Sequence, residues 1–99
     1  MNIRINYHNG HFTVNSLQDI AKHCSSAAQM HQALANDTVQ RILRNKLGDY
    51  RWSLEGNTHR GYYIAANWRG SQWQEVLNQN TPRKAFQAFL DRYNILETY

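Results

Sequence analysis

Cysteine and long apolar runs are both scarce in this chain, and each scarcity excludes a class of protein. Cys24 is the single cysteine among 99 residues, so an intramolecular disulfide is excluded, and we expect a reducing, cytoplasmic location. No apolar run approaches the roughly 20 residues of a membrane-spanning helix, so we expect no membrane partner. The first residues alternate apolar and polar side chains, which is typical of a strand and not of a signal peptide.

Catalytic and cofactor motifs are also missing. The sequence has neither the glycine-lysine loop of nucleotide hydrolases nor the glycine fingerprint of dinucleotide-binding folds. Its seven acidic residues are scattered, and no spacing forces two carboxylates together. Among five histidines, only His8 and His11 are expected to face each other, whereas a structural zinc site needs four ligands. We therefore expect a non-enzymatic protein with no catalytic residue, no metal and no cofactor.

Cys24 and His31 are the one nucleophile–base pair that the spacing allows. They lie seven residues apart and would share a face if one helix ran unbroken between them. The same helical stripe contains Leu17 and Ile20, and a thiol among such residues is ordinarily a small core side chain. We expect Cys24 to be buried and unreactive.

The remaining composition is that of one globular domain, residues 1–99. Hydrophobic residues make up 41% and charged residues 18%, and no linker or repeat interrupts the chain. The net charge is +4, which favours an acidic partner such as nucleic acid. Six of the eleven basic residues lie within residues 38–69, together with only two acidic ones.

Alternation of apolar and polar side chains predicts two antiparallel β-hairpins. Residues 2–15 alternate around Asn9-Gly10, a dipeptide that suits the positive φ angles of a type I′ turn. A two-residue loop at that dipeptide would set Tyr7 opposite Phe12 and Ile5 opposite Val14. Residues 50–69 alternate on both sides of a polar turn, and Trp52, Tyr62, Trp68 and Trp73 are interpreted as core or interface anchors.

Residues 16–47 are predicted to form two or three short helices. Ser16 is a good N-cap, and Ser25-Ser26 either interrupts a first helix or caps a second one. A further helix starts after Asn36, where Asp37 and Gln40 have the spacing of a capping box. Gly48 is the expected C-cap of that helix.

A C-terminal amphipathic helix is predicted over residues 81–93, with Thr81 as N-cap and Pro82 in its first turn. Residues 71–77 fit a third strand or a short helix equally well. The expected fold class is α+β. In its plain form both hairpins share one antiparallel sheet that has helices on one face.

Within residues 37–64, an apolar and basic helical segment ends in Leu-Gly, and an Arg-Gly-Tyr sequence follows in the predicted hairpin. The residues concerned are Val39, Ile42, Leu43, Arg44, Lys46, Leu47 and Gly48, then Arg60, Gly61 and Tyr62. This segment resembles the winged-helix DNA-binding domain of response regulators, in which a third helix ends in a basic, Leu-Gly-terminated turn and the second strand of the following hairpin starts near a Gly-Tyr pair. The resemblance implies a winged-helix-like arrangement, with Arg41, Arg44 and Lys46 as groove or phosphate contacts and Arg60 as a wing contact.

Charge and aromatic content together predict a small macromolecule-binding domain with DNA or RNA as its first-choice partner. A basic and aromatic surface of helix plus hairpin would contact phosphates, with modest sequence readout. The expected nucleic-acid contacts are Arg41, Arg44, Lys46, Arg51, Arg60 and Arg69. Arg83 and Lys84, in the first turn of the last helix, are candidate anion contacts.

The alternative hypothesis is a protein–protein interaction module, such as a small phage- or plasmid-type inhibitor or adaptor acting on a larger protein complex. Trp, Tyr and Arg dominate interface hot spots, and alternation leaves Tyr63 outside as a candidate aromatic contact. Salt would separate the two hypotheses, because phosphate contacts weaken steeply with ionic strength and aromatic contacts do not.

Overall fold

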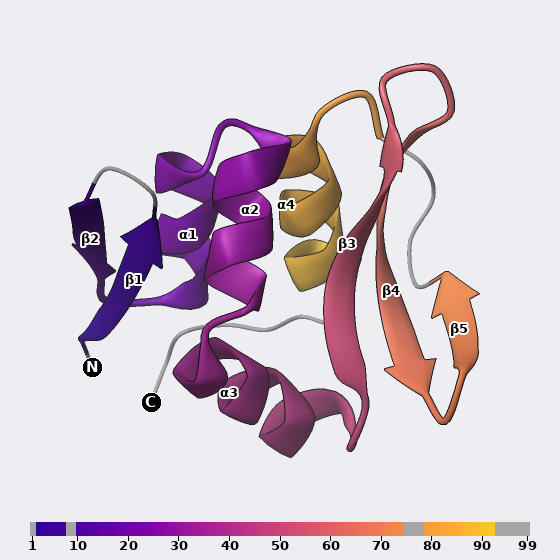
Figure 1. Ribbon diagram of the computed structural model, residues 1–99, viewed down its shortest axis with the longest axis horizontal. Coiled ribbons are helices and arrows are strands. Elements are labelled where there is room, and N and C mark those ends of the chain that lie inside the picture. The colour runs from indigo at the N-terminus through magenta and orange to yellow at the C-terminus, as the bar shows by residue number, and fades with distance from the viewer. Residues whose placement is uncertain (1, 8–9, 75–78, 93–99) are drawn as a thin grey trace.

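Figure 1 shows the computed structural model, which describes residues 2–7, 10–74 and 79–92. Its elements are β1 (Ile3–Tyr7), β2 (Gly10–Val14), α1 (Leu17–His23), α2 (Ala27–Leu34), α3 (Asp37–Leu47), β3 (Arg51–Asn57), β4 (Gly61–Trp68), β5 (Ser71–Gln74) and α4 (Pro82–Arg92). The predicted α+β class is confirmed, with three helices between the hairpins. Residues 71–74 form a strand, while residues 75–77 of that ambiguous segment and Tyr93 lie outside the described residues.

The hairpins form two separate sheets, so the expectation of one shared sheet is wrong. β1 and β2 make a two-stranded sheet, and β3, β4 and β5 make a three-stranded sheet in that order. Helices α1, α2 and α4 lie between the sheets (Figure 1): α1 and α2 pack on β2 and β1, α2 also contacts β3, and α4 contacts β4. Each sheet has an apolar face to bury, and a helical layer between them covers both.

The first hairpin pairs two residues away from the predicted register. Ile5 faces Phe12 instead of Val14, and Ile3 faces Val14. The same side chains still share a face, because the side-chain period of a strand is two. In the predicted register Ile3 would face Ser16, which instead caps α1 by accepting a hydrogen bond from a first-turn N–H at 3.2 Å.

Polar caps separate the three helices that follow. Ser26 and Gln29 form a capping box at the start of α2, so the second serine of Ser25-Ser26 begins a new helix. Asn36 caps α3, where its Oδ1 accepts hydrogen bonds from the N–H groups of Thr38 and Val39 at 2.9 and 3.2 Å. The predicted capping box of Asp37 and Gln40 is therefore wrong, and Gln40 is released for another role.

Gln40 is buried and joins α3 to β3. Its Nε2 donates to the carbonyl oxygens of Leu34 and Trp52, each at 2.6 Å, and its Oε1 accepts from the Trp52 N–H at 3.1 Å. β3 is an edge strand, so the outward backbone groups of Trp52 have no neighbouring strand. The Gln40 amide replaces that strand, which closes this edge and holds α3 beside the start of β3.

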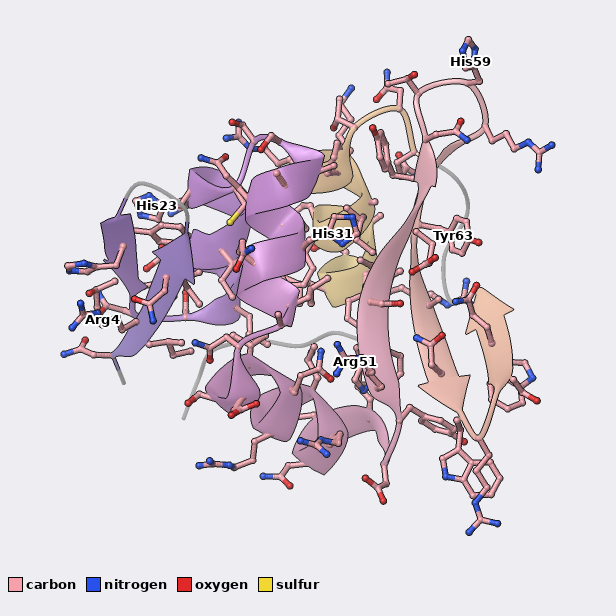
Figure 2. The ribbon with its side chains drawn as sticks, in the orientation of Figure 1. Arg4, His23, His31, Arg51, His59 and Tyr63 are labelled. Carbon is pink, nitrogen blue, oxygen red and sulfur yellow. The ribbon has the colours of Figure 1, made fainter. Side chains whose placement is uncertain are left out.

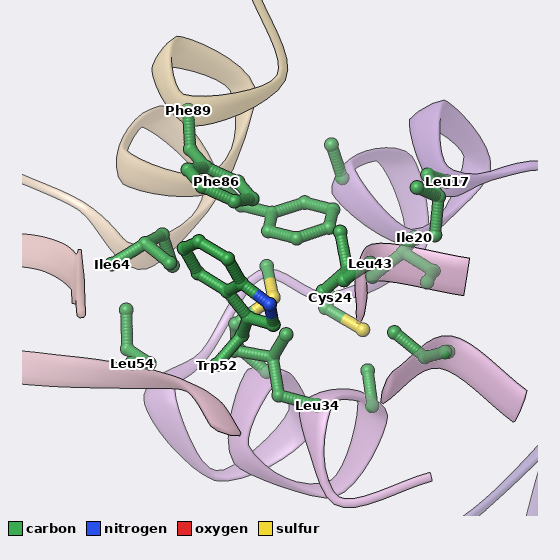
Figure 3. Close-up of a cluster of buried hydrophobic side chains, with 14 of the residues drawn as sticks. Leu17, Ile20, Cys24, Leu34, Leu43, Trp52, Leu54, Ile64, Phe86 and Phe89 are labelled. Carbon is green, nitrogen blue, oxygen red and sulfur yellow. The ribbon is translucent and has the colours of Figure 1, made fainter. Parts of the chain in front are cut away.

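The core is one cluster that extends from the first hairpin through the helices to the three-stranded sheet. Figure 3 shows Phe86 and Phe89 of α4 around Trp52, with Cys24 and Leu34 close by, and all five side chains are buried. Thr81 caps α4, since its Oγ1 accepts from the Lys84 N–H at 3.1 Å. Among the described residues no helix is both long and apolar enough to span a bilayer.

Candidate macromolecule-binding surface

Trp68 and Trp73 are the large hydrophobic side chains that the described part of the chain leaves exposed, at 46% and 47%. β4 and β5 pair so that Trp68 faces Ser71 and Ala66 faces Trp73. The two indoles are thus diagonal neighbours on one face of the sheet, beside the turn at Arg69-Gly70. Exposed apolar groups that lie side by side are where interaction sites are sought, so this pair of indoles is the candidate surface.

A chain of aromatic contacts connects Trp73 to the core. The Phe89 and Trp52 ring centroids lie 5.4 Å apart, Trp52 and Tyr50 5.8 Å, and Tyr50 and Trp73 6.0 Å. Tyr50 and Trp68 also line a shallow groove of about 420 Å³. Trp73 therefore packs against rings that are themselves held by the core, so binding of a partner would order its side chain little further.

Arg69 occupies the turn between β4 and β5 with a φ of 49°. A left-handed backbone disfavours arginine, and asparagine or glycine is the usual residue at such a position. The guanidinium lies 4.6 Å from the centroid of the Trp68 ring, a cation–π contact that leaves the side chain exposed. The turn thus presents a cation directly beside the indole.

Arg44 and Arg51 lie at the same end of the sheet as this turn. Arg51 begins β3 and pairs with Asn67, the residue before Trp68, so its side chain is at the same end of the sheet but on the face opposite the two indoles. The Arg44 Nε donates to the Gln40 carbonyl at 3.4 Å, on the flank of α3 that faces β3. We call the group of Arg44, Tyr50, Arg51, Trp68, Arg69 and Trp73 the basic-aromatic end.

The other predicted contacts on α3 are arranged differently. Arg41 is exposed and lies three residues before Arg44, so the two are neighbours on the helix surface. Lys46 lies two residues after Arg44, which turns it roughly 160° around the helix axis. Arg41 therefore extends the basic-aromatic end, and Lys46 points from the other flank of α3.

Arg60 and Tyr63 are not brought together with α3. Figure 2 shows His59 at the tip of the β3–β4 hairpin and Arg51 near its opposite end. Arg60 follows His59 in that tip, about 20 Å along the strand from Arg51 at the usual rise per residue. Tyr63 pairs with Glu55 in the middle of the hairpin and is half-buried. The expected convergence of helix and hairpin tip is absent.

Arg83 and Lys84 lie beside the C-terminus of α1, far along the chain from the groove residues. Arg83 donates from an Nη atom to the Lys22 carbonyl at 3.0 Å, where a cation complements the negative end of the α1 dipole. Lys22, Arg83 and Lys84 line a separate hollow of about 360 Å³. Arg83 thus has a structural contact of its own.

Cys24 and His31 do not form a nucleophile–base pair. Cys24 ends α1 and is buried, whereas His31 lies on α2 and is exposed. Burial raises the pKa of the Cys24 thiol to about 11, although the nearby Arg83 charge lowers it, so the thiol is protonated at neutral pH. His11 faces Asn6, and the described residues contain no group of three metal-binding side chains.

Comparison with protein-family models, with curated proteins and with solved structures gives no match. The roles of Gln40 and Tyr50 were not predicted. The capping-box spacing of Gln40 was misleading, and Tyr50 directly precedes β3, where alternation did not mark it as an anchor. The half-exposure of Trp73 had no local signal, because it depends on which helices cover the sheet.

Proposed function

We propose that the protein binds nucleic acid through the basic-aromatic end. The observation that carries this proposal is the set of exposed arginines on α3 and at this end of the sheet: Arg69 lies against Trp68, and none of Arg41, Arg44, Arg51 and Arg69 forms an ion pair with an acidic side chain of the described residues. Unpaired guanidinium groups are free to contact phosphates bidentately. Net charge of +4 adds a long-range attraction for a polyanion.

Phosphate contacts would supply most of the affinity. Each contact releases condensed counterions, so binding weakens steeply as salt rises. Among the described residues, the exposed arginines of this proposal are divided between α3, the start of β3 and the β4–β5 turn, so we expect few base-reading contacts within one groove and a modest sequence preference. The winged-helix resemblance adds to this proposal the contacts at Arg41 and Arg44.

A charge-reversal experiment tests the proposal. Arg44→Glu plus Arg51→Glu should weaken binding of a 20-nucleotide DNA at 50 mM salt at least tenfold and flatten its salt dependence. Fluorescence anisotropy with labelled single-stranded and duplex DNA measures both quantities. The matched control is Lys22→Glu plus Lys84→Glu, which changes the net charge equally at the α1–α4 hollow. Equal losses from both double variants would contradict a localised surface.

A protein partner is the second candidate, and the groove favours it. Leu47 and Asp49 line the groove together with Tyr50 and Trp68. Asp49 would repel a phosphate but can accept hydrogen bonds from a polypeptide, and exposed tryptophans are frequent interface hot spots. If wild-type protein binds neither DNA nor heparin at low salt, the basic-aromatic end is better explained as a protein-binding surface.

A further inference from the structure

We infer that Trp68 and Trp73 stack on the bases of single-stranded nucleic acid, an inference that rests on the proposed function and names the form of its ligand. Base stacking on aromatic side chains needs an exposed ring whose position is held in advance. Both indoles are about half exposed, and both rest on neighbouring groups: Arg69 on Trp68, and Tyr50 on Trp73.

The spacing of the two indoles suits consecutive bases of an extended strand. Trp68 and Trp73 are diagonal across the β4–β5 pair, which sets the two residues about 7–8 Å apart and their Cβ atoms somewhat closer. An extended, unstacked single strand can separate successive bases by a comparable distance. Each indole can then contact one base without the strand having to double back.

A cation lies beside the stacking surface, where the backbone of such a strand can contact it. The Arg69 guanidinium lies 4.6 Å from the centroid of the Trp68 ring, whereas Arg51 alternates with Trp52 and points to the opposite face of the sheet. Alternating aromatic and cationic contacts are the recurrent arrangement for sequence-tolerant single-strand binding. Their positive charge selects a polyanion over a neutral peptide for the same pair of rings.

Duplex DNA does not offer these indoles a comparable contact. Its base faces are covered by their neighbours in the stack, and only base edges are accessible in the grooves. Trp68 and Trp73 would meet the sugar–phosphate backbone of a duplex, where an indole finds no stacking partner. The geometry therefore points to a preference for single strands.

The test measures intrinsic tryptophan fluorescence and anisotropy with a labelled 12-nucleotide oligothymidylate, a 12-base-pair duplex and heparin. Wild-type protein should bind the single strand at least tenfold more tightly than the duplex, with quenching of tryptophan emission. Trp73→Leu keeps an apolar side chain without the π system and should weaken single-strand binding about tenfold. Trp73→Phe should lie within about threefold of wild type, and Trp68→Leu gives an independent measurement at the second ring.

Heparin separates failure of this inference from failure of the proposed function, because it carries charge without bases. Heparin binding should be unchanged in Trp73→Leu and lost in Arg44→Glu plus Arg51→Glu. Equal affinity for single strand and duplex, with no effect of either tryptophan variant, would overturn base stacking and leave nucleic-acid binding in place. Absence of binding to all three probes at 50 mM salt would overturn both. Circular dichroism establishes that each variant is folded before binding is measured.

Discussion

Trp52 and Trp73 lie in one cross-strand row of the three-stranded sheet, on either side of Ala66. They share a residue type and a sheet face, yet Trp52 is 3% exposed and Trp73 is 47% exposed. Phe89 of α4 packs on Trp52 with ring centroids 5.4 Å apart, whereas Trp73 extends beyond the helical layer. The position of the helices, and not the type of side chain, therefore decides that Trp52 belongs to the core and Trp73 to the surface.

The two edges of the same sheet differ in a parallel way. At β3 the Gln40 side chain satisfies the backbone N–H and C=O of Trp52, so that edge is closed from within the domain. At β5 the exposed residues Ser71, Gln72 and Trp73 flank the outer edge. Among the described residues, no further strand pairs with the outer side of β5, so the two edges of the sheet differ in how their backbone groups are satisfied.

The largest expected effect is the loss of stability when Trp52 is replaced, compared with the small loss when Trp73 is replaced. Trp52→Ala should lower the free energy of unfolding by about 3–5 kcal/mol, because it removes a buried indole and leaves a cavity against Phe89. Trp73→Ala should cost less than about 1 kcal/mol, since half of the ring already contacts water. Urea denaturation followed by circular dichroism measures both. Similar losses of stability for the two variants would contradict the assignment of Trp52 to the core and of Trp73 to the surface.

A smaller loss is expected when the closed edge is opened. Gln40→Leu keeps the side-chain volume but leaves the backbone groups of Trp52 and the Leu34 carbonyl without their hydrogen-bond partner. The free energy of unfolding should fall by about 2–4 kcal/mol in total. The same denaturation measurement applies. Asn45→Leu, an exposed substitution on the same helix, is the control and should change stability by less than about 0.5 kcal/mol. A tolerated Gln40→Leu would mean that the edge is not held by this amide.

The smallest expected effect is a gain in stability, at the turn between β4 and β5. Arg69→Asn should raise the free energy of unfolding by about 0.5 kcal/mol, because Asn-Gly suits the positive φ angles of this turn better than Arg-Gly. The same variant should weaken nucleic-acid binding, since it removes a cation beside Trp68. Thermal unfolding measures the change in stability, and titration with oligothymidylate measures the change in affinity. A variant with unchanged stability would show that the turn carries no strain.

Local patterns predicted most of the elements. Alternation placed both hairpins, and Ser16 and Thr81 marked helix starts that the structure retains. The register of the first hairpin was wrong by two residues, since Asn9-Gly10 marks a turn without specifying its centre. The separation into two sheets was also missed, because strand alternation says which face is buried and not what covers it.

The candidate site was predictable in composition and not in arrangement. Arg44, Arg51 and Arg69 were singled out by charge, and they do lie at one end of the sheet. Arg60 carries the same charge but lies in the opposite turn, about 20 Å away along β3. Sequence proximity between a helix and a hairpin says nothing about which end of the hairpin the helix meets, so only the packing of α3 against β3 could separate these arginines.

By itself the sequence determined the α+β class, the helix caps, the apolar faces of the strands and the surplus of arginine, because each depends on neighbours within a few positions along the chain. Tertiary structure alone decided that Gln40 closes one edge of the sheet and that Trp52 is buried while Trp73 is half exposed. These outcomes depend on contacts between residues far apart in the sequence, where side-chain burial is set by which element packs above a strand and not by the strand's own pattern.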